Sequence, residues 1–335
     1  MSASGPAAAS SDMEVPSSAA RRGILWPIAA LVLAFLIGWP LVAPNPFLFT
    51  IGTFIVLNAI GATSLHLIIR TGHISLGHAA FMGVGAYCCV LSVRMLGLPP
   101  LLGLAVGMAG AALLALLIGP VVLRLTGKYF VLVTFLLGEI IRMVFVEWIS
   151  VTGGSNGISG LPPLHPSLAT PMAIYYVCLA ASVLCVGLCA RILTSEVGRV
   201  IDSVREAERV AECSGVPVIR LKVTIFVLAC ALVGLQGGLL AFFLRYIDPT
   251  SFSMVESLNL VVMNVVGGMY SLVGPLIGTV FLVALPELLR GYVELQHVFF
   301  GIILIVVMAA LPGGMVEIFT KAGKLLAGRK SGGAR

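Results

Sequence analysis

The chain has 335 residues, of which 59% are hydrophobic and only 10% are charged. Ordinary soluble domains carry about 25% charged residues, and the mean hydropathy here is +1.10, so a soluble domain is excluded. The net charge of +6 does not indicate a nucleic-acid partner, because the basic residues fall in short clusters beside apolar runs. That arrangement sets membrane topology, and we expect a protein embedded in the lipid bilayer.

The apolar runs are continuous rather than alternating, which favours helices over a β-barrel. At about 20 residues per span, we predict an all-α polytopic bundle of about eight to eleven transmembrane helices. The seven cysteines include no CxxC pair, so neither a disulfide framework nor a metal site is expected. Cys178, Cys185 and Cys189 share one face of a predicted helix, where a packing role is favoured.

The amino-terminal residues 1–22 are rich in Ser, Ala and Pro and are expected to be disordered in the cytoplasm. Arg21 and Arg22 precede an apolar run that is too long for the core of a cleaved signal peptide. We therefore expect the transmembrane domain to cover 23–315, with a basic cytoplasmic tail at 316–335. The predicted spans are 24–43, 47–69, 74–96, 99–123, 128–148, 172–193, 222–244, 256–270, 273–290 and 297–315.

This topology places sixteen of the twenty basic residues on the cytoplasmic side together with both termini, as the positive-inside rule requires. The stretches 72–90 and 256–290 contain enough Gly, Ser and Pro to suit re-entrant or broken helices, which are tolerated only inside protein or beside a water-filled cavity. The outer connection 151–167 carries Gly-Gly, Asn-Gly and Pro-Pro turn pairs. It suits either a plain loop or a docking platform for an external protein.

One long charged segment, 194–222, interrupts the apolar chain and is expected in the cytoplasm. Its apolar positions recur at helical spacing, from Val197 through Ile201 and Val204 to Ala211, which predicts an amphipathic helix of about five turns or two shorter helices. Thr194 or Ser195 is expected to cap the start, and Gly215 to end it. Between 194 and 215 five acids face three arginines, whereas helices that rest on lipid are basic. A protein groove is the expected destination of the apolar stripe.

The residues of this segment resemble the cytoplasmic coupling loop of the permeases of ABC importers, specifically the branched-chain amino-acid permease family of the LivM type. The matching coupling positions are Ser195, Gly198, Arg199, Arg205, Glu206, Glu208, Arg209, Ala211, Glu212 and Gly215. Further matches run through most of the chain: Gly72, 75–81, Gly83, 85–87, Gly127, Tyr129, Phe130, Thr134, Glu139, Trp148, 153–154, 156–157, 267–268, Ser271, 274–275, Gly278 and 286–290. His73 departs from an expected Gln, and Ala207 from a common Asn.

The resemblance implies a transmembrane subunit in a bacterial cytoplasmic (inner) membrane. It implies three kinds of partner: a homologous second permease, two cytoplasmic ATPase subunits and an external substrate-binding protein. The chain has no GxxxxGK[ST] phosphate loop, so ATP and Mg are expected on the partner subunits and no cofactor on this chain. ATP would act by moving the coupling segment, which would switch the permease between two states. The residues expected to contact the ATPases are Gly198, Arg199, Arg205, Glu206, Glu208, Arg209, Ala211 and Gly215.

Polar side chains inside predicted spans are costly and mark functional candidates. Glu139 and Arg142 lie three residues apart and can pair on one helix face, either to hold the bundle or permease dimer together or to contact solute. The other candidates for the translocation pathway are Ser75, His78 and Asn264, with Asn58 and Asn259 as further polar points. For His78 the competing interpretation is a structural histidine that bonds a neighbouring backbone group. For the three asparagines it is a hydrogen bond between helices.

We expect the solute to be a branched-chain or other hydrophobic amino acid. Relatives of this family also handle urea, short amides and aromatic acids, which stay open as alternatives. A gradient-driven secondary transporter or channel is a second hypothesis. A membrane-embedded enzyme is a third, but its candidate groups His78, Glu139 and His297 lie on scattered elements without spacing suited to catalysis.

Overall fold

The computed structural model describes residues 36–39, 46–164, 170–288, 298, 301–302, 305–306, 309 and 314–317. Contacts divide the chain into two units, Met1–Phe49 and Thr50–Arg335. In the first unit residues 36–39 are helical, and Trp39 Nε1 donates a hydrogen bond to the Leu48 carbonyl at 3.1 Å. Most of the expected spans 24–43 and 297–315, the amino terminus that was expected to be disordered, and nearly all of the expected basic tail lie outside the described residues.

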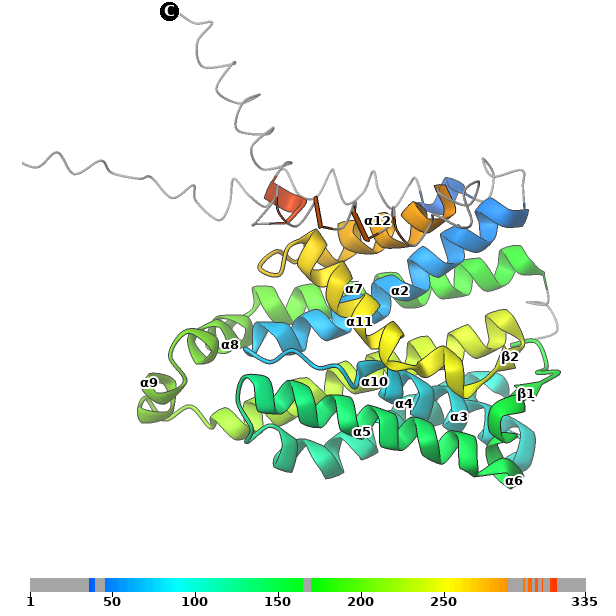
Figure 1. The fold of residues 1–335 in the computed structure, drawn as a ribbon, viewed down its shortest axis with the longest axis horizontal. Helices are drawn as coiled ribbons and strands as arrows, with labels where there is room; N and C mark the ends of the chain where they lie inside the picture. Colours follow the sequence, from blue (N-terminus) through cyan, green and yellow to red (C-terminus); the bar gives the residue numbers. More distant parts are fainter. Residues whose placement is uncertain are drawn as a thin grey trace, which may run out of the picture. The chain divides into compact units, whose positions relative to one another are not determined.

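The fold is an all-α bundle, as predicted (Figure 1). Six helices of the described chain are long and apolar enough to cross a membrane: α2 (Pro46–Arg70), α3 (His78–Leu96), α4 (Pro100–Val122), α5 (Lys128–Glu147), α7 (Pro171–Thr194) and α10 (Val218–Leu244). Two shorter apolar helices follow, α11 (Met254–Gly267) and α12 (Gly274–Leu288). The polytopic fold class is therefore confirmed.

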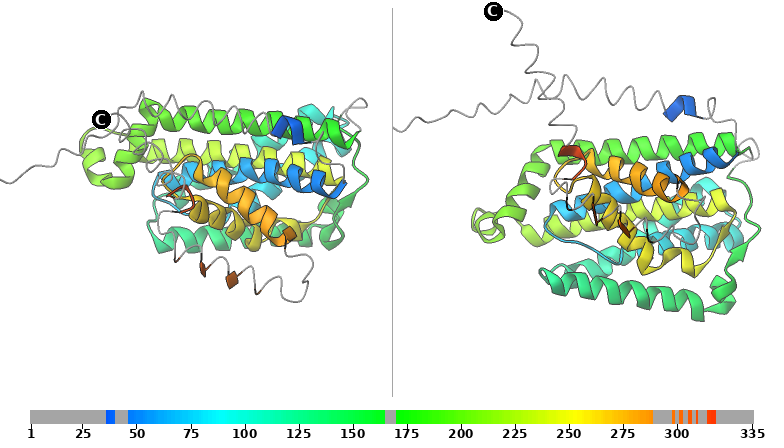
Figure 2. Two further views of the ribbon diagram at one scale, coloured as in Figure 1. Left: turned by 90° about the horizontal axis from the view of Figure 1, so that it is seen from above. Right: turned by 45° about the horizontal axis from the view of Figure 1, so that its top comes forward.

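Helix α10 forms the centre of the bundle and packs closely against α3 and α4. Glycines permit the close approach: a Cβ at Gly85 of α3 would overlap the backbone of Gly234 in α10, and one at Gly107 of α4 would overlap the carbonyl of Gly85. Small residues at such crossings are typical of membrane helix packing. The two views of Figure 2 show α5 and α7 on opposite sides of α10.

The two stretches expected to contain broken helices are both broken. Residues 71–77 are irregular, with Gly72 at φ +88°, before α3 begins at His78. The 256–290 region divides into α11 and α12 around residues 268–273, with Gly268 at φ +126°. At 1.5 Å per residue, the 14 residues of α11 cover about 21 Å, less than the ~30 Å hydrocarbon core of a bilayer.

The connection after α5, which includes residues 151–167, is partly ordered rather than a plain loop. It contains α6 (Ile149–Thr152), η1 (Gly154–Asn156) and β1 (Ile158–Ser159), and β1 pairs antiparallel with β2 (Tyr246–Ile247) beyond α10. In this two-stranded sheet Ile158 lies opposite Ile247, and η3 (Pro249–Phe252) follows β2. Residues far apart in sequence thus form one small platform at this end of the bundle; its docking role stays a prediction.

The charged segment forms two short helices, α8 (Glu196–Glu206) and α9 (Glu208–Cys213), so the second of the two alternatives is correct. The break lies at Ala207, whose φ of −150° and ψ of 76° are not helical. Gly215, at φ +86°, ends the segment as predicted. Ser195 occupies the N-cap position of α8, one of the two predicted positions, but its hydroxyl donates back to the Ile192 carbonyl and makes no side-chain cap bond.

Candidate functional site

Two opposite ends of the bundle carry different features (Figure 1). Helices α8 and α9 lie at one end, and α6, β1 and β2 lie at the other. Most basic residues of the described loops and helix ends belong to the first end: Arg70, Arg124, Lys128, Arg191, Arg199, Arg205, Arg209, Arg220 and Lys222. We call this end the coupling end.

The apolar stripe of α8 and α9 packs largely against its own chain. Ile201, Val204 and Ala211 are buried, and Val204 and Ala211 form a small core with Val218 at the start of α10. The prediction that the whole stripe enters a partner's groove is therefore wrong. Val197 of the stripe, 44% exposed, and the neighbouring Val210, 65% exposed, remain accessible to a partner.

The eight predicted coupling residues divide into inward and outward groups. Gly198 is buried, and a Cβ there would overlap the Leu193 carbonyl. Arg205, Glu208 and Ala211 also contact the chain itself. Arg199, Glu206, Arg209 and Gly215 are exposed; the ion pair between Arg199 and Glu196 and the Glu206 carboxylate, 73% exposed, offer charge to solvent or to a partner.

Arg70, the last residue of α2, binds α8 through Asp202. Arg70 Nε donates to Asp202 Oδ1 at 2.9 Å, and Arg70 Nη2 contacts both carboxylate oxygens. Arg70 Nη1 also donates to the Tyr270 carbonyl at 3.3 Å, and the Arg205 guanidinium lies 5.0 Å from the centre of the Tyr270 ring. One arginine therefore joins α2, α8 and the 268–273 connection that precedes α12.

Helix α9 binds α10 through a second ion pair. Lys222 Nζ donates to Glu208 Oε1 at 2.6 Å. The Lys222 side chain is only 1% exposed, whereas that of Glu208 is 40% exposed. A buried ammonium is stable only when paired, so Glu208 holds α9 against the first turns of α10.

His73, one of the departures from the family pattern, lies in the irregular stretch near this pair. Its Nδ1 lies 3.2 Å from the Thr71 carbonyl, and its ring packs edge-on against Phe130 at 4.7 Å between centres. Burial lowers the pKa of His73 below its usual value, and the positive charge of Lys222 lowers it further. The ring is therefore neutral near pH 7 and donates through Nδ1 to the carbonyl.

The predicted pathway residues His78, Ser75 and Asn264 are fully buried in the helix packing. The Ser64 hydroxyl donates to the Gly61 carbonyl, so its oxygen accepts from His78 Nε2 at 2.8 Å. Asn264 donates to the Ala62 and Leu260 carbonyls, both at 2.9 Å, and its Oδ1 accepts from His66. For Asn264 these contacts match the structural interpretation; for His78 they do as well, although its partner is a side-chain hydroxyl rather than a backbone group.

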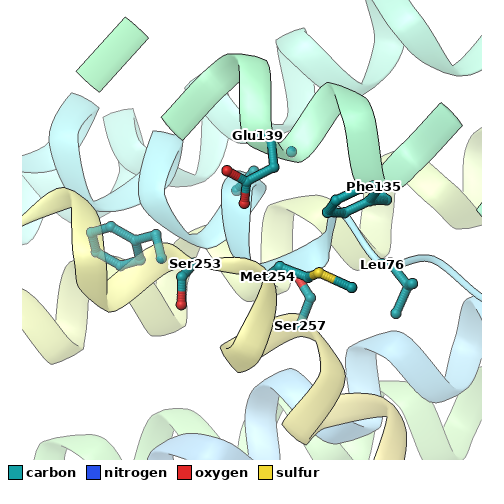
Figure 3. A pocket seen from close by; sticks show the side chains of 9 residues that line it. Leu76, Phe135, Glu139, Ser253, Met254 and Ser257 are labelled. Carbon is teal, nitrogen blue, oxygen red and sulfur yellow. The ribbon is translucent and has the colours of Figure 1, made fainter. Parts of the chain in front are cut away.

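Glu139 and Arg142 pair as predicted, with Arg142 Nε donating to Glu139 Oε2 at 2.8 Å. Both side chains are 27% exposed in the isolated chain. Figure 3 shows Glu139 pointing from α5 toward the segment that carries Ser253 and Met254. The recess between them leaves no room for even one water molecule in this conformation, so it offers no solute site as it stands.

A larger cavity of about 290 Å³ lies in the other half of the bundle, away from α8 and α9. The residues of α2 that line the cavity lie in the amino-terminal half of that helix, away from Arg70. Those of α10 lie in its carboxy-terminal half, which precedes β2. The lining residues are Phe54, Leu57, Asn58, Met82, Gln236, Leu240, Leu244, Ser251 and Glu256. Of the predicted pathway candidates Ser75, His78, Glu139, Arg142 and Asn264, none lines it; Asn58, a secondary candidate, does.

The family described as "Branched-chain amino acid transport system / permease component" matches residues 47–308. The chain belongs to this family. The sequence is 29% identical to the high-affinity branched-chain amino acid transport system permease protein LivM of Salmonella typhimurium, over 92% of this chain and 78% of that protein.

The LivM protein of Escherichia coli is 28% identical over the same shares of the two chains. No solved structure gives a significant match. The matched region contains α3 to α12 and nearly all of α2, so the bundle described above is the family's permease domain. The chain is accordingly a multi-span membrane permease component and not an enzyme.

Three polar cavity residues, Gln236, Ser251 and Glu256, were missed by the sequence analysis. Gln236 lies within the apolar run that forms α10. It is the one amide side chain among 27 helical residues, and a single polar residue shows no periodicity that would tell which face of the helix it lies on. Glu256 was placed in a predicted span without a role. An isolated acid at the start of an apolar segment is the signal that could have identified it.

Proposed function

We propose that this permease component is the transmembrane subunit of an ATP-driven importer for branched-chain or other hydrophobic amino acids in a bacterial cytoplasmic membrane. The relatives LivM are described as parts of a branched-chain amino-acid transport system, which supports the solute class. In this proposal the coupling end faces the cytoplasm, since it carries most of the basic residues of the described loops.

The observation that carries the proposal is the double attachment of the charged segment. Arg70–Asp202 fastens α8 to α2, and Glu208–Lys222 fastens α9 to α10. A partner that binds the exposed charges of α8 and α9 would therefore displace two transmembrane helices together. Two cytoplasmic ATPase subunits are the proposed partners, and ATP would act through its different affinity for the two states of the complex.

The other proposed partners follow from the remaining surfaces. Helix α5 is the least buried of the six candidate spans, so its exposed apolar face is available to lipid or to the homologous second permease. The β1–β2 platform lies at the end opposite the coupling helices (Figure 1). It would meet the external substrate-binding protein.

The test is a charge reversal of an exposed coupling residue in the full complex reconstituted in proteoliposomes. We expect Glu206→Arg to abolish co-purification of the ATPases and leucine-stimulated ATP hydrolysis. The matched control is Glu147→Arg, which reverses an exposed acid at the end of the bundle away from α8 and α9 and should leave co-purification of the ATPases intact. ATPase binding and stimulation that survive Glu206→Arg and Gly215→Ala would overturn the coupling assignment. Uptake driven by an ion gradient without ATP would show a secondary transporter instead.

A further inference from the structure

The 290 Å³ cavity is large enough for one small solute and has a mixed lining. One water molecule needs only about 10–15 Å³ of such space, so the cavity has room for more than water alone. Five apolar side chains line it, together with four polar ones; the apolar set is Phe54, Leu57, Met82, Leu240 and Leu244. Small-molecule sites typically combine an apolar lining with a few placed polar groups.

Asn58 offers hydrogen-bond donors to this cavity. Gln236 Nε2 donates to Asn58 Oδ1 at 3.1 Å, which occupies the acceptor of the Asn58 amide. Asn58 Nδ2 has no acceptor among the described residues, and the side chain is partly exposed. Gln236 is buried, and its Oε1 lies against Gly61, where a Cβ would overlap it, with no hydrogen-bond partner among the described residues. The pair therefore presents the N–H groups of Asn58 to whatever occupies the cavity, and these suit a carboxylate.

Glu256 offers a carboxyl group to the same cavity. Its carboxylate accepts one hydrogen bond, from Asn259 Nδ2 at 3.3 Å, and it forms no ion pair with the cations of the described chain. A carboxylate in apolar surroundings is costly without a cation. The nearby Ser251 hydroxyl donates to Asp248, which leaves its oxygen free to accept. Glu256 and Ser251 therefore suit an ammonium group.

We propose that this cavity is a transit site for a zwitterionic amino acid with an aliphatic side chain. Glu256 contacts the ammonium group, Asn58 the carboxylate, and the apolar lining the side chain. This inference rests on the proposed function and narrows its solute class. Urea carries neither charge and would leave the apolar lining unused, and an aromatic acid without an amino group would leave Glu256 unpaired.

The test uses the complete transporter in proteoliposomes, with uptake of radiolabelled leucine and ATP hydrolysis measured together. We expect Glu256→Gln and Asn58→Ala each to lower leucine uptake at least about tenfold, the effect of one lost charged or polar contact. The control Glu147→Gln neutralises an acid outside the cavity. ATP hydrolysis without solute should be unchanged in all three variants, since none lies at the coupling end.

A second pair of variants tests whether the open volume of the cavity is needed, rather than its polar groups. Leu240→Trp fills the cavity and should block uptake, whereas Leu184→Trp adds the same bulk to an exposed position of α7, 73% exposed, and should not. If Glu256→Gln prevents assembly of the complex, Asn58→Ala and Leu240→Trp decide the question.

The outcomes separate the two proposals. A wild-type complex that imports leucine without ATP, or imports no aliphatic amino acid, contradicts the proposed function. A wild-type complex that imports leucine with ATP, while Asn58→Ala and Leu240→Trp transport at the wild-type rate, overturns the cavity assignment alone. Loss of uptake in both variants with normal controls supports the cavity as the transit site.

Discussion

Arg70 and Asp202, 132 residues apart in sequence, form a two-pronged ion pair that joins the end of α2 to the middle of α8. Arginine and carboxylate groups match in geometry, and such bidentate contacts are among the stronger and more directional ones in proteins. The Arg70 side chain is only 14% exposed, so little water competes with Asp202. Helix α2 also carries Asn58 of the cavity, so one helix contacts both α8 and the cavity.

We expect Asp202→Asn to uncouple the transporter without dissociating it. The neutral amide keeps the size of the side chain but removes the charge that holds Arg70. Leucine-stimulated ATP hydrolysis should fall about tenfold, within the range of coupling free energies of about 1–3 kcal/mol, while the ATPases still co-purify. The double variant Arg70→Asp with Asp202→Arg should recover part of the stimulation. Full stimulation in Asp202→Asn would show that coupling takes another route.

The ion pair between Glu208 and Lys222 should contribute measurably to the free energy of unfolding. Removing one partner of a buried pair leaves an uncompensated charge, which costs about 3–5 kcal/mol. Because Glu208 is 40% exposed, we expect Glu208→Ala to lower the free energy of unfolding by about 2–3 kcal/mol, near or below the low end of that range. The measurement is thermal unfolding of the purified subunit in detergent.

Lys222→Met supplies the control for this pair. In the Glu208→Ala background it removes the unpaired ammonium and keeps most of the side-chain volume, so it should restore much of the lost stability. If Lys222→Met destabilises the Glu208→Ala variant further, the ammonium has another partner and the pair is not what holds α9.

The sequence predicted the helical class, the two broken stretches and the charged segment, because each has a local signal in hydropathy or in Gly and Pro content. The three cysteines predicted to share a face of α7 are indeed buried. The sequence around a single polar residue does not reveal which distant residue it will contact in the fold. Lys222 looked like one more basic residue at a span end, and only the fold brings Glu208 within 2.6 Å of it. Asn58 and Gln236 meet across 178 residues.

The amphipathic stripe shows the same limit. Helical spacing identified the apolar face of α8 and α9 correctly, since Ile201, Val204 and Ala211 are all buried. Spacing does not tell which surface covers that face. The starting turn of α10, through Val218, covers part of it, so the exposed charges on the opposite face are left for the partner.

Because α3 and α10 pack closely at Gly85, adding one methyl group there should lower the stability of the chain. We expect Gly85→Ala to lower the unfolding free energy by roughly 1–3 kcal/mol, the usual cost of overpacking, because the new Cβ would overlap the backbone of Gly234. Gly187→Ala in α7 is the matched control, with no atom within 4 Å of the new Cβ. It should be neutral or stabilising, since alanine favours helix by about 0.5–1 kcal/mol over glycine. Equal thermal midpoints for the two variants would contradict this packing.

Gly215 should resist substitution for a conformational reason alone. Its φ is +86°, and a Cβ added there would meet no atom within 4 Å, so any penalty comes from the backbone. Left-handed conformation costs non-glycine residues roughly 1–2 kcal/mol. We expect Gly215→Ala to lower the unfolding free energy by about that amount and Gly215→Asn by less, because asparagine tolerates this region. A reversed order of the two midpoints would rule out backbone strain.

His73 should make the stability of the chain depend on pH. Burial and the nearby Lys222 charge lower its pKa in the folded state below the usual value of 6.5. Between the lowered pKa and 6.5, the unfolded chain binds a proton that the folded chain does not, so the free energy of unfolding falls as the pH falls through this window. Above 6.5 the ring is neutral in both states and contributes no slope.

The measurement is the thermal midpoint of the detergent-purified subunit at intervals from about pH 7.5 down to about pH 5, the range in which histidine titrates. His73→Gln keeps a polar side chain without a titrating group, so its midpoint should fall less steeply on acidification than that of the wild type. Carboxylates and the other histidines titrate in both proteins, and the difference between the two curves isolates His73. Parallel curves would mean that His73 is protonated alike in the folded and unfolded states, which its burial beside Lys222 and Phe130 argues against.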